Sequence, residues 1–172
     1  MNSPPKDRDS RYSWLAEGNA KQARKRVAAK IIIRDQIGRI LLVNPTYKEY
    51  WDVPGGMAEA NEPPRFAAER EIVEELGVHV EAGALLVLDW IGPHGPWDDQ
   101  LVFIFDGGTL SGDAISKLAI TDREISELGF FSASDASRLL RPDVAKWLMR
   151  AVDSLATNRT HYTEQYDIDY PD

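Results

Sequence analysis

The chain has 172 residues, 43% of them hydrophobic, and a net charge of −8, which suits one globular domain with a sizeable core. The absence of cysteine excludes disulfides and thiolate metal sites, and the acidic balance argues against non-specific nucleic-acid binding. No apolar stretch approaches the roughly 18 residues that span a bilayer, and the polar N-terminus shows no export signal. We therefore expect a cytoplasmic protein with neither a membrane nor a nucleic acid as partner.

The first predicted elements are two strands joined by a tight turn. Residues 1–25 are polar and charged, and we expect a flexible N-terminal segment with a short helix near Trp14. Residues 27–34 and 39–43 are rich in Ile, Leu and Val, and the turn between them contains Asp and Gly, so the pair predicts a hairpin. Irregular backbone is then predicted for residues 51–56, where a proline precedes paired glycines.

A helix is predicted next, ending at Gly77. Asn61 or Glu62 can cap it, and the two prolines at 63 and 64 suit its first turn, while glycine is the usual helix stop. Its apolar positions share one arc and are expected to face the core: Phe66, Ala68, Ile72, Val73 and Leu76. The opposite face carries three carboxylates at spacings of three and four: Glu71, Glu74 and Glu75.

These three carboxylates indicate a binding site for a cation. Like charges at such spacings destabilise an isolated helix by roughly 0.2–0.5 kcal/mol per pair. A hard divalent metal prefers carboxylate oxygens and would remove the repulsion. Bound Mg²⁺ would also let an acidic protein hold a phosphorylated substrate. If the spacing stood alone, a solvated helix face would explain it equally well.

The remaining pattern completes one α/β (α+β) domain. Three further strands are predicted at residues 84–90, 101–106 and 127–132, and a terminal helix at 133–156 that Pro142 either starts or divides. The domain is expected to span residues 26–157 and to be followed by an acidic tail, 158–172, that is either mobile or docks late. Strands mixed with two helices favour a layered sandwich.

The carboxylates belong to a longer pattern with a specific register. The residues Gly56-x5-Glu62-x7-Arg70-Glu71-Ile72-Val73-Glu74-Glu75-Leu76-Gly77-Val78 fill all nine specified positions of G-x5-E-x7-R-E-U-x-E-E-x-G-U, where U is aliphatic. This segment resembles the signature of the Nudix hydrolase family. The resemblance covers about residues 26–135, and it implies an α/β/α sandwich with a mixed central sheet.

The resemblance also implies roles for individual residues. Arg70 would orient the catalytic Glu71, which itself orients or deprotonates the attacking water or joins the metal shell. Glu124, in a late loop, is the favoured general base from outside the motif, with Glu127, Asp98 and Asp99 as alternatives. A surface role without catalysis would explain Glu124 and Glu127 equally well. The implied ligands of Mg²⁺, for which Mn²⁺ could substitute, are Gly55 through its carbonyl, Glu71, Glu74 and Glu75. The residues expected to support the motif are Gly56, Glu62 and Gly77.

The implied reaction is hydrolysis of the pyrophosphate bond in a nucleoside diphosphate linked to a moiety X. The substrate would be a small-molecule nucleotide, and because dimers are common in the family, a homodimer is a further expectation. The alternative is a non-catalytic nucleotide-binding regulatory module on the same fold. We expect the loop at residues 91–100 to form one wall of the pocket. The predicted substrate-binding side chains are Trp51, Trp90, His94 and Trp97.

Overall fold

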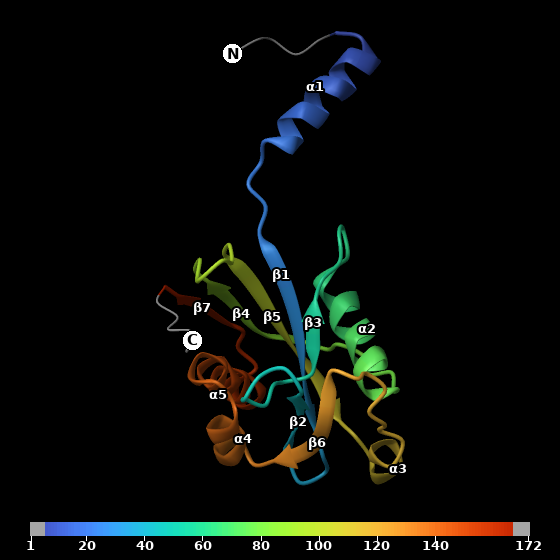
Figure 1. Cartoon of the computed structure of the whole chain (residues 1–172), viewed down its shortest axis with the longest axis vertical. Helices are drawn as coiled ribbons and strands as arrows, with labels where there is room; N and C mark the ends of the chain where they lie inside the picture. Colours follow the sequence, from blue (N-terminus) through green and yellow to red (C-terminus); the bar gives the residue numbers. More distant parts are fainter. Residues whose placement is uncertain (1–5, 167–172) are drawn as a thin grey trace.

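The computed structural model describes residues 6–166 and shows a mixed sheet between layers of helices (Figure 1). The seven strands of this sheet are β1 (Arg26–Arg34), β2 (Ile40–Pro45), β3 (Gly55–Met57), β4 (Leu85–Ile91), β5 (Gln100–Thr109), β6 (Ile125–Phe131) and β7 (His161–Gln165). The helices in this part of the chain are α1 (Arg8–Ala20), α2 (Pro64–Leu76), α3 (Gly112–Ile115), α4 (Ala133–Leu139) and α5 (Pro142–Thr157).

The strand order is β6-β2-β1-β5-β4-β7, with β3 paired to β1 beside this path. β1 pairs with β5, and β4 with β7, in parallel, whereas the other pairs are antiparallel. Successive residues of β1 face opposite sides: Ile31 packs in the hydrophobic cluster beneath α2, and Ile32 packs in the cluster beneath α4 and α5. The predicted α/β/α sandwich with a mixed central sheet is therefore confirmed.

The hairpin strands β1 and β2 diverge away from their shared turn. They pair where Arg34 faces Ile40, but further along β1 the partner is β3, with Lys30 opposite Gly55. β2 instead pairs with β6 along its length. Because β3 takes the place beside β1, the segment that carries the paired glycines is brought against the middle of the sheet.

Helix α2 differs from the prediction at its start and on its apolar face. Its N-cap is Pro63, which makes no side-chain hydrogen bond, so the predicted cap at Asn61 or Glu62 was wrong. Phe66 and Val73, expected in the core, are 61% and 44% exposed. The buried positions are the following: Ala67, Ala68, Ile72 and Leu76.

The other end of α2 follows the prediction. Gly77 ends the helix in the left-handed region at φ 68°, and its N–H donates to the Val73 carbonyl at 3.0 Å. The structure also explains Glu69, an acidic side chain within the apolar arc. Its carboxylate accepts the Ala82 N–H at 2.8 Å, so it fixes the segment that leaves the helix.

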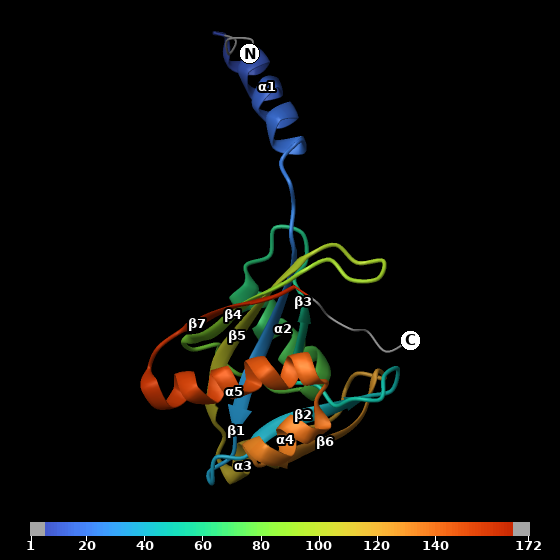
Figure 2. The ribbon, with the colours of Figure 1, turned by 90° about the vertical axis from the view of Figure 1, so that its left-hand side faces the viewer.

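The two ends of the described chain carry elements that the sequence pattern only partly indicated. The helix near Trp14 is longer than predicted, spanning 13 residues, has no buried residue and extends away from the sandwich (Figure 2). The predicted terminal helix is divided into α4 and α5 before Pro142. Residues 161–165, assigned to the tail, add β7 to the sheet; residues 1–5 and 167–172 lie outside the described range. Within that range no helix is long and apolar enough to cross a bilayer.

Candidate active site

A cavity of about 250 Å³ lies where β1 and β2 diverge, bounded by β3 and α2. Its charged lining consists of one base and five acids: Lys30, Asp52, Glu71, Glu75, Asp122 and Glu124. Its remaining lining is formed by Val43, Pro45, Tyr47, Gly55, Gly56, Met57 and Ile125. The structure thus brings three predicted functional residues, Glu71, Glu75 and Glu124, to one pocket with the paired glycines.

Glu124 reaches this pocket because its segment caps the end of α2. The last carbonyls of a helix have no partner within the helix. Here Ala119 N–H donates to Leu76 O at 3.1 Å, and Thr121 donates through N–H to Glu75 O at 3.0 Å and through its hydroxyl to Glu74 O at 2.5 Å. Glu124 follows three residues later and lines the pocket, which Glu127 does not.

Arg70 holds the outer side of the carboxylate cluster together. Its Nε and Nη2 donate to the two carboxylate oxygens of Glu62 at 2.9 and 3.0 Å, and its Nη1 donates to Glu71 at 3.0 Å and to Glu74 at 2.8 Å. A further bond at 3.1 Å reaches the Met57 carbonyl. The bonds from Arg70 lower the pKa of Glu62 to about 2. Arg70 therefore fixes Glu71 against the loop that precedes the helix.

The predicted metal ligands are only partly gathered. Glu74 turns to Arg70, its side chain is 54% exposed, and it does not line the cavity. Between residues 6 and 166, no three Asp, Glu or His side chains converge closely enough to hold a metal ion. The structure thus brings Glu71, Glu75 and Gly55 together, and a full ligand set would require Glu74 to leave Arg70.

The positive charge near Glu71 and Glu75 nevertheless does not offset the effect of burial on their pKa values. Burial raises the pKa of Glu75 to about 7, against the opposing effect of Lys30, and Glu75 accepts the Gly55 N–H at 3.0 Å. Burial also raises the pKa of Glu71, although Arg70 opposes it. A Cβ on Gly56 would lie 2.5 Å from the Glu71 carboxyl carbon, so glycine is what allows that carboxylate its place. The pocket is confined and lined by carboxylate and carbonyl oxygens, which are the ligands that hard divalent cations prefer.

Three charged residues of the pocket were missed by the sequence prediction: Lys30, Asp52 and Asp122. Lys30 donates to the Gly55 carbonyl at 2.6 Å and to Asp52 at 3.1 Å. The available signal was a lysine within the otherwise apolar run V-A-A-K-I-I-I of β1. Asp52 also accepts from Lys48 at 2.6 Å, and these two lysines lower its pKa although burial acts in the opposite direction.

None of the predicted substrate-binding side chains lines this cavity. Trp51 packs edge-on against Phe131, with ring centroids 5.0 Å apart, over the cluster beneath α4 and α5. Trp90 donates to Asp99 at 2.8 Å. His94 and Trp97 exchange backbone hydrogen bonds in the loop after β4. A substrate-binding role for these four residues remains a prediction.

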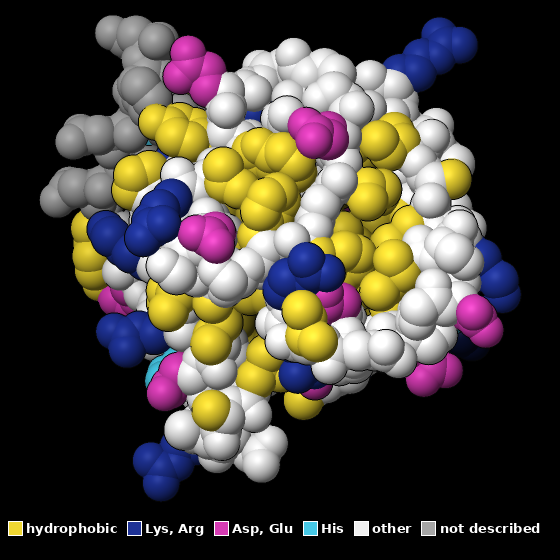
Figure 3. Space-filling view, turned by 90° about the horizontal axis from the view of Figure 1, so that it is seen from below, with side chains coloured by type: hydrophobic (Ala, Val, Ile, Leu, Met, Phe, Trp, Pro, Cys, Tyr) yellow, Lys and Arg dark blue, Asp and Glu magenta, His cyan; other side chains and the backbone are white. Residues whose placement is uncertain are grey.

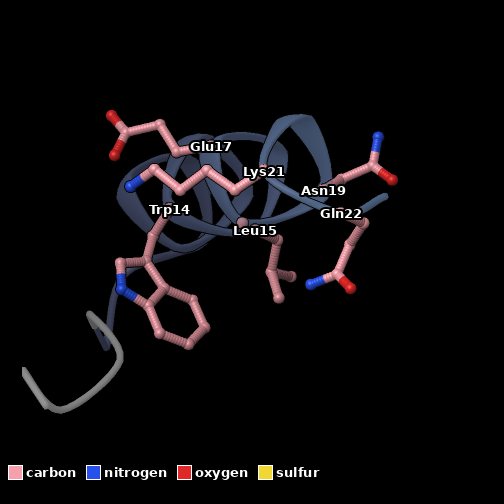
Figure 4. Close-up of a pocket in the computed structure, with 7 residues that line it drawn as sticks. Trp14, Leu15, Glu17, Asn19, Lys21 and Gln22 are labelled. Carbon is pink, nitrogen blue, oxygen red and sulfur yellow. The ribbon is translucent and has the colours of Figure 1, made fainter. Parts of the chain in front are cut away.

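A larger hollow of about 450 Å³ lies along α1, but it does not have the character of a site. It is lined by residues of that helix and the turn after it, among them Trp14, Leu15 and Lys21 (Figure 4). Because this helix buries none of its residues, the hollow is open surface. At the opposite end of the molecule, basic and acidic side chains are interspersed around exposed hydrophobic ones (Figure 3). The charged cavity at α2 is thus a better candidate for the active site than the hollow along α1.

A large part of the chain resembles known proteins. A family model described as the NUDIX domain matches residues 24–152. The rat protein named diphosphoinositol polyphosphate phosphohydrolase 2 is 42% identical over 64 residues, which are 37% of this chain and 36% of that protein. The match thus spans about a third of that relative's length.

Solved structures resemble a larger part of the chain. The MutT protein from Methanosarcina mazei Go1 superposes with a TM-score of 0.65 at 20% identity, covering 78% of this chain and 99% of that one. The MutT NUDIX hydrolase from Burkholderia pseudomallei has a TM-score of 0.62 at 25% identity, over 74% of this chain and 98% of that one.

Proposed function

This chain belongs to the NUDIX domain family, and on that premise we propose that it hydrolyses the pyrophosphate bond of a nucleoside diphosphate linked to a moiety X. The observation that carries the proposal is the pair of half-buried carboxylates, Glu71 and Glu75, set against Gly55 and Gly56 and short of positive charge. Groups with raised pKa values in a concave site are typical of catalysis.

In this proposal Mg²⁺, with Mn²⁺ as a substitute, would be held by Glu71, Glu75 and the Gly55 carbonyl, and by Glu74 once it leaves Arg70. A bound cation would supply positive charge against the diphosphate and would lower the pKa of a bound water. Arg70 keeps the Glu71 carboxylate oriented through its 3.0 Å bond. Glu124, which lines the same pocket, would accept a proton from the attacking water.

The charge of the pocket supports a substrate with few phosphates. One lysine faces five carboxylates, so phosphate groups can enter only with accompanying cations. A ligand that carries many phosphates would require a basic surface that this lining does not provide. A nucleoside diphosphate linked to X therefore suits the pocket better than the diphosphoinositol polyphosphate in the rat relative's name.

The alternative function is a non-catalytic nucleotide-binding regulatory module. Such a module needs no oriented carboxylate, whereas here Arg70 bonds Glu62, Glu71 and Glu74 simultaneously. The intact network favours catalysis. A cytoplasmic location and a homodimer remain predictions from the sequence.

The test is release of nucleoside monophosphate from a substrate panel in the presence of Mg²⁺. The panel comprises nucleoside triphosphates, oxidised deoxynucleoside triphosphates, ADP-ribose, NADH, dinucleoside polyphosphates, nucleotide sugars and one diphosphoinositol polyphosphate, with phosphate release monitored for the last. Glu74→Gln and Glu75→Gln serve as controls and should abolish most turnover. Binding of Mg²⁺ and nucleotide without turnover of any compound would replace the hydrolase by the regulatory module.

A further inference from the structure

Lys30 is the only basic side chain among the described residues that line the pocket. It projects from the middle of β1 between the fully buried Ala29 and Ile31, and its side chain is 15% exposed. Its ammonium donates to the Gly55 carbonyl at 2.6 Å and to Asp52 at 3.1 Å. A buried ammonium needs such partners, because an unpaired charge away from water is costly.

The Gly55 peptide is held on both sides. Its carbonyl accepts from Lys30, while its N–H donates to Glu75 at 3.0 Å. Its backbone has φ 118° and lies so close to β1 that a Cβ would be 2.3 Å from the Ala29 carbonyl oxygen. This close packing leaves the carbonyl little freedom to turn elsewhere. The oxygen that a divalent cation would use is therefore already bonded to a cation of the chain itself.

The Lys30 ammonium has a second hydrogen-bond acceptor in the Asp52 carboxylate. Lys48 also donates to Asp52, at 2.6 Å, but Lys48 does not line the pocket. A lysine side chain has four rotatable methylene links, so the ammonium can shift fully onto Asp52 without leaving a charge unpaired. Such a shift would free the Gly55 carbonyl and move positive charge away from Glu71 and Glu75.

We propose that Lys30 is a resident counter-cation that holds the Gly55 carbonyl in the metal-free protein and competes with a divalent metal for it. The inference rests on the proposed function, because it concerns the metal of that same site. Lys30 acts here as a positioning residue. It stabilises the pocket without metal and weakens metal binding below what the carboxylates alone would give.

The test is a titration of the full chain with Mn²⁺, without substrate, followed by the paramagnetic resonance signal of the free ion. Lys30→Met should bind Mn²⁺ about tenfold more tightly than the wild type, because it removes the competing charge and frees the carbonyl. Lys48→Met is the matched control: it removes the same charge from Asp52 but not from the Gly55 carbonyl. It should change the affinity by less than about twofold.

Folding of the variants is followed by circular dichroism. Lys30→Gln retains a donor but no charge, and it should also bind Mn²⁺ more tightly, though less so than Lys30→Met. Should both variants unfold without metal, the proposal requires Mn²⁺ to restore their folding, and failure to do so overturns it. Unchanged or weaker binding in folded Lys30 variants overturns it as well, as does equal tightening in Lys48→Met.

The two hypotheses fail differently. A wild type that binds Mn²⁺ and hydrolyses a substrate, with no tightening in the Lys30 variants, removes only the role of Lys30. Absence of Mn²⁺ binding in the wild type and all variants removes the metal-dependent function and this inference together. Binding that is detected only in the Lys30 variants supports competition directly.

Discussion

The carboxylates of α2 and its preceding loop fall into two regions with opposite electrostatics. On the outer side, Arg70 satisfies Glu62 and Glu74, and the pKa of Glu62 falls to about 2 because of that pairing. On the inner side, Glu75 is half-buried with Lys30 as the nearby cation, and burial raises its pKa to about 7. Glu71 lies between the two regions, bonded to Arg70 and lining the cavity.

The difference indicates that one motif contains two kinds of carboxylate, one that holds the structure and one that is available for chemistry. Without a metal, the outer carboxylates are paired with Arg70 and fix the geometry of the loop. In the proposed function, the inner carboxylates would bind a cation, joined by Glu74 once it leaves Arg70. An unpaired buried charge is destabilising and persists where function requires it. Changes that displace or neutralise the inner carboxylates should therefore reduce activity more than stability, and changes on the outer side should act through orientation.

The largest effect is expected from Gly56→Ala on the inner side. The new Cβ would lie 2.5–2.7 Å from the Glu71 carboxyl atoms, which form the end of a flexible side chain and can move away. We expect kcat/KM to fall by about 10²–10³-fold, as when an oriented catalytic group is lost, with little change in melting temperature. Steady-state kinetics and thermal unfolding measure both.

Gly55→Ala is the contrasting variant. Its Cβ would meet the Ala29 carbonyl oxygen, a backbone atom, at 2.3 Å and at a positive φ, so the fold itself should be destabilised. If Gly56→Ala retained wild-type kcat/KM, the position of the Glu71 carboxylate would not matter for the reaction.

A smaller loss of activity is expected from Arg70→Lys on the outer side. Lysine keeps the charge, but its single ammonium cannot bond Glu62 and Glu71 in the way the planar guanidinium does. Loss of an orienting partner typically costs about 10–100-fold, and we expect the fall in kcat with KM nearly unchanged. Arg65→Lys, on the same helix but bonded to the Gly83 carbonyl, is the matched control. Equal kcat in Arg70→Lys and wild type would contradict an orienting role.

The two regions should also respond oppositely to pH in metal-free protein. Because the folded pKa of Glu75 is raised, stability is lost as pH rises from its ordinary value of 4.5 through about 7. Glu75→Gln removes this loss, so it should be more stable than wild type at pH 8 by up to about 2–3 kcal/mol. The difference should disappear below pH 4.5. Urea unfolding in the presence of EDTA across this range gives the free energies.

Glu62→Gln is the counterpart with the opposite sign. Its folded pKa is lowered, so the charged carboxylate contributes stability above the ordinary value of 4.5, and that contribution is lost as pH falls through about 2. Glu62→Gln should therefore be less stable than wild type at pH 8. Two variants that shift stability in the same direction would show that the inner and outer regions are not electrostatically distinct.

The outer region was predictable from the sequence, because its contacts lie within or beside one helix. The spacing of Arg70 and Glu74 places them one turn apart, and the structure joins them at 2.8 Å. Gly77 likewise acts locally as the helix stop. Glu124 was indicated by family resemblance, although its cavity position depends on how residues 119–121 cap α2.

The inner region was less predictable, because it depends on pairing between distant strands. Nothing in the pattern of β1 shows that β3 replaces β2 beside it, and that replacement is what sets Lys30 against Gly55. The strand β7 was missed for the same reason, since its partner residues in β4 lie 74 positions earlier in the chain. Phe66 and Val73 were misplaced because periodicity alone does not give the width of the packed face.

The smallest effect is expected from Trp97→Ala, which asks whether recognition of X extends beyond the cavity. Trp97 is 53% exposed, and the Arg26 guanidinium lies 4.7 Å from its ring centroid. This contact holds the indole in place, so that a base of the substrate could stack on it. Stacking of a base on an aromatic ring is worth about 1 kcal/mol at the lower end, which corresponds to a roughly fivefold rise in KM. We expect kcat to stay unchanged because the ring does not line the pocket.

Trp14→Ala, on the protruding helix, should alter neither parameter. If Trp97→Ala also left KM and kcat unchanged, X would be recognised at the cavity itself, where Tyr47 is the aromatic side chain.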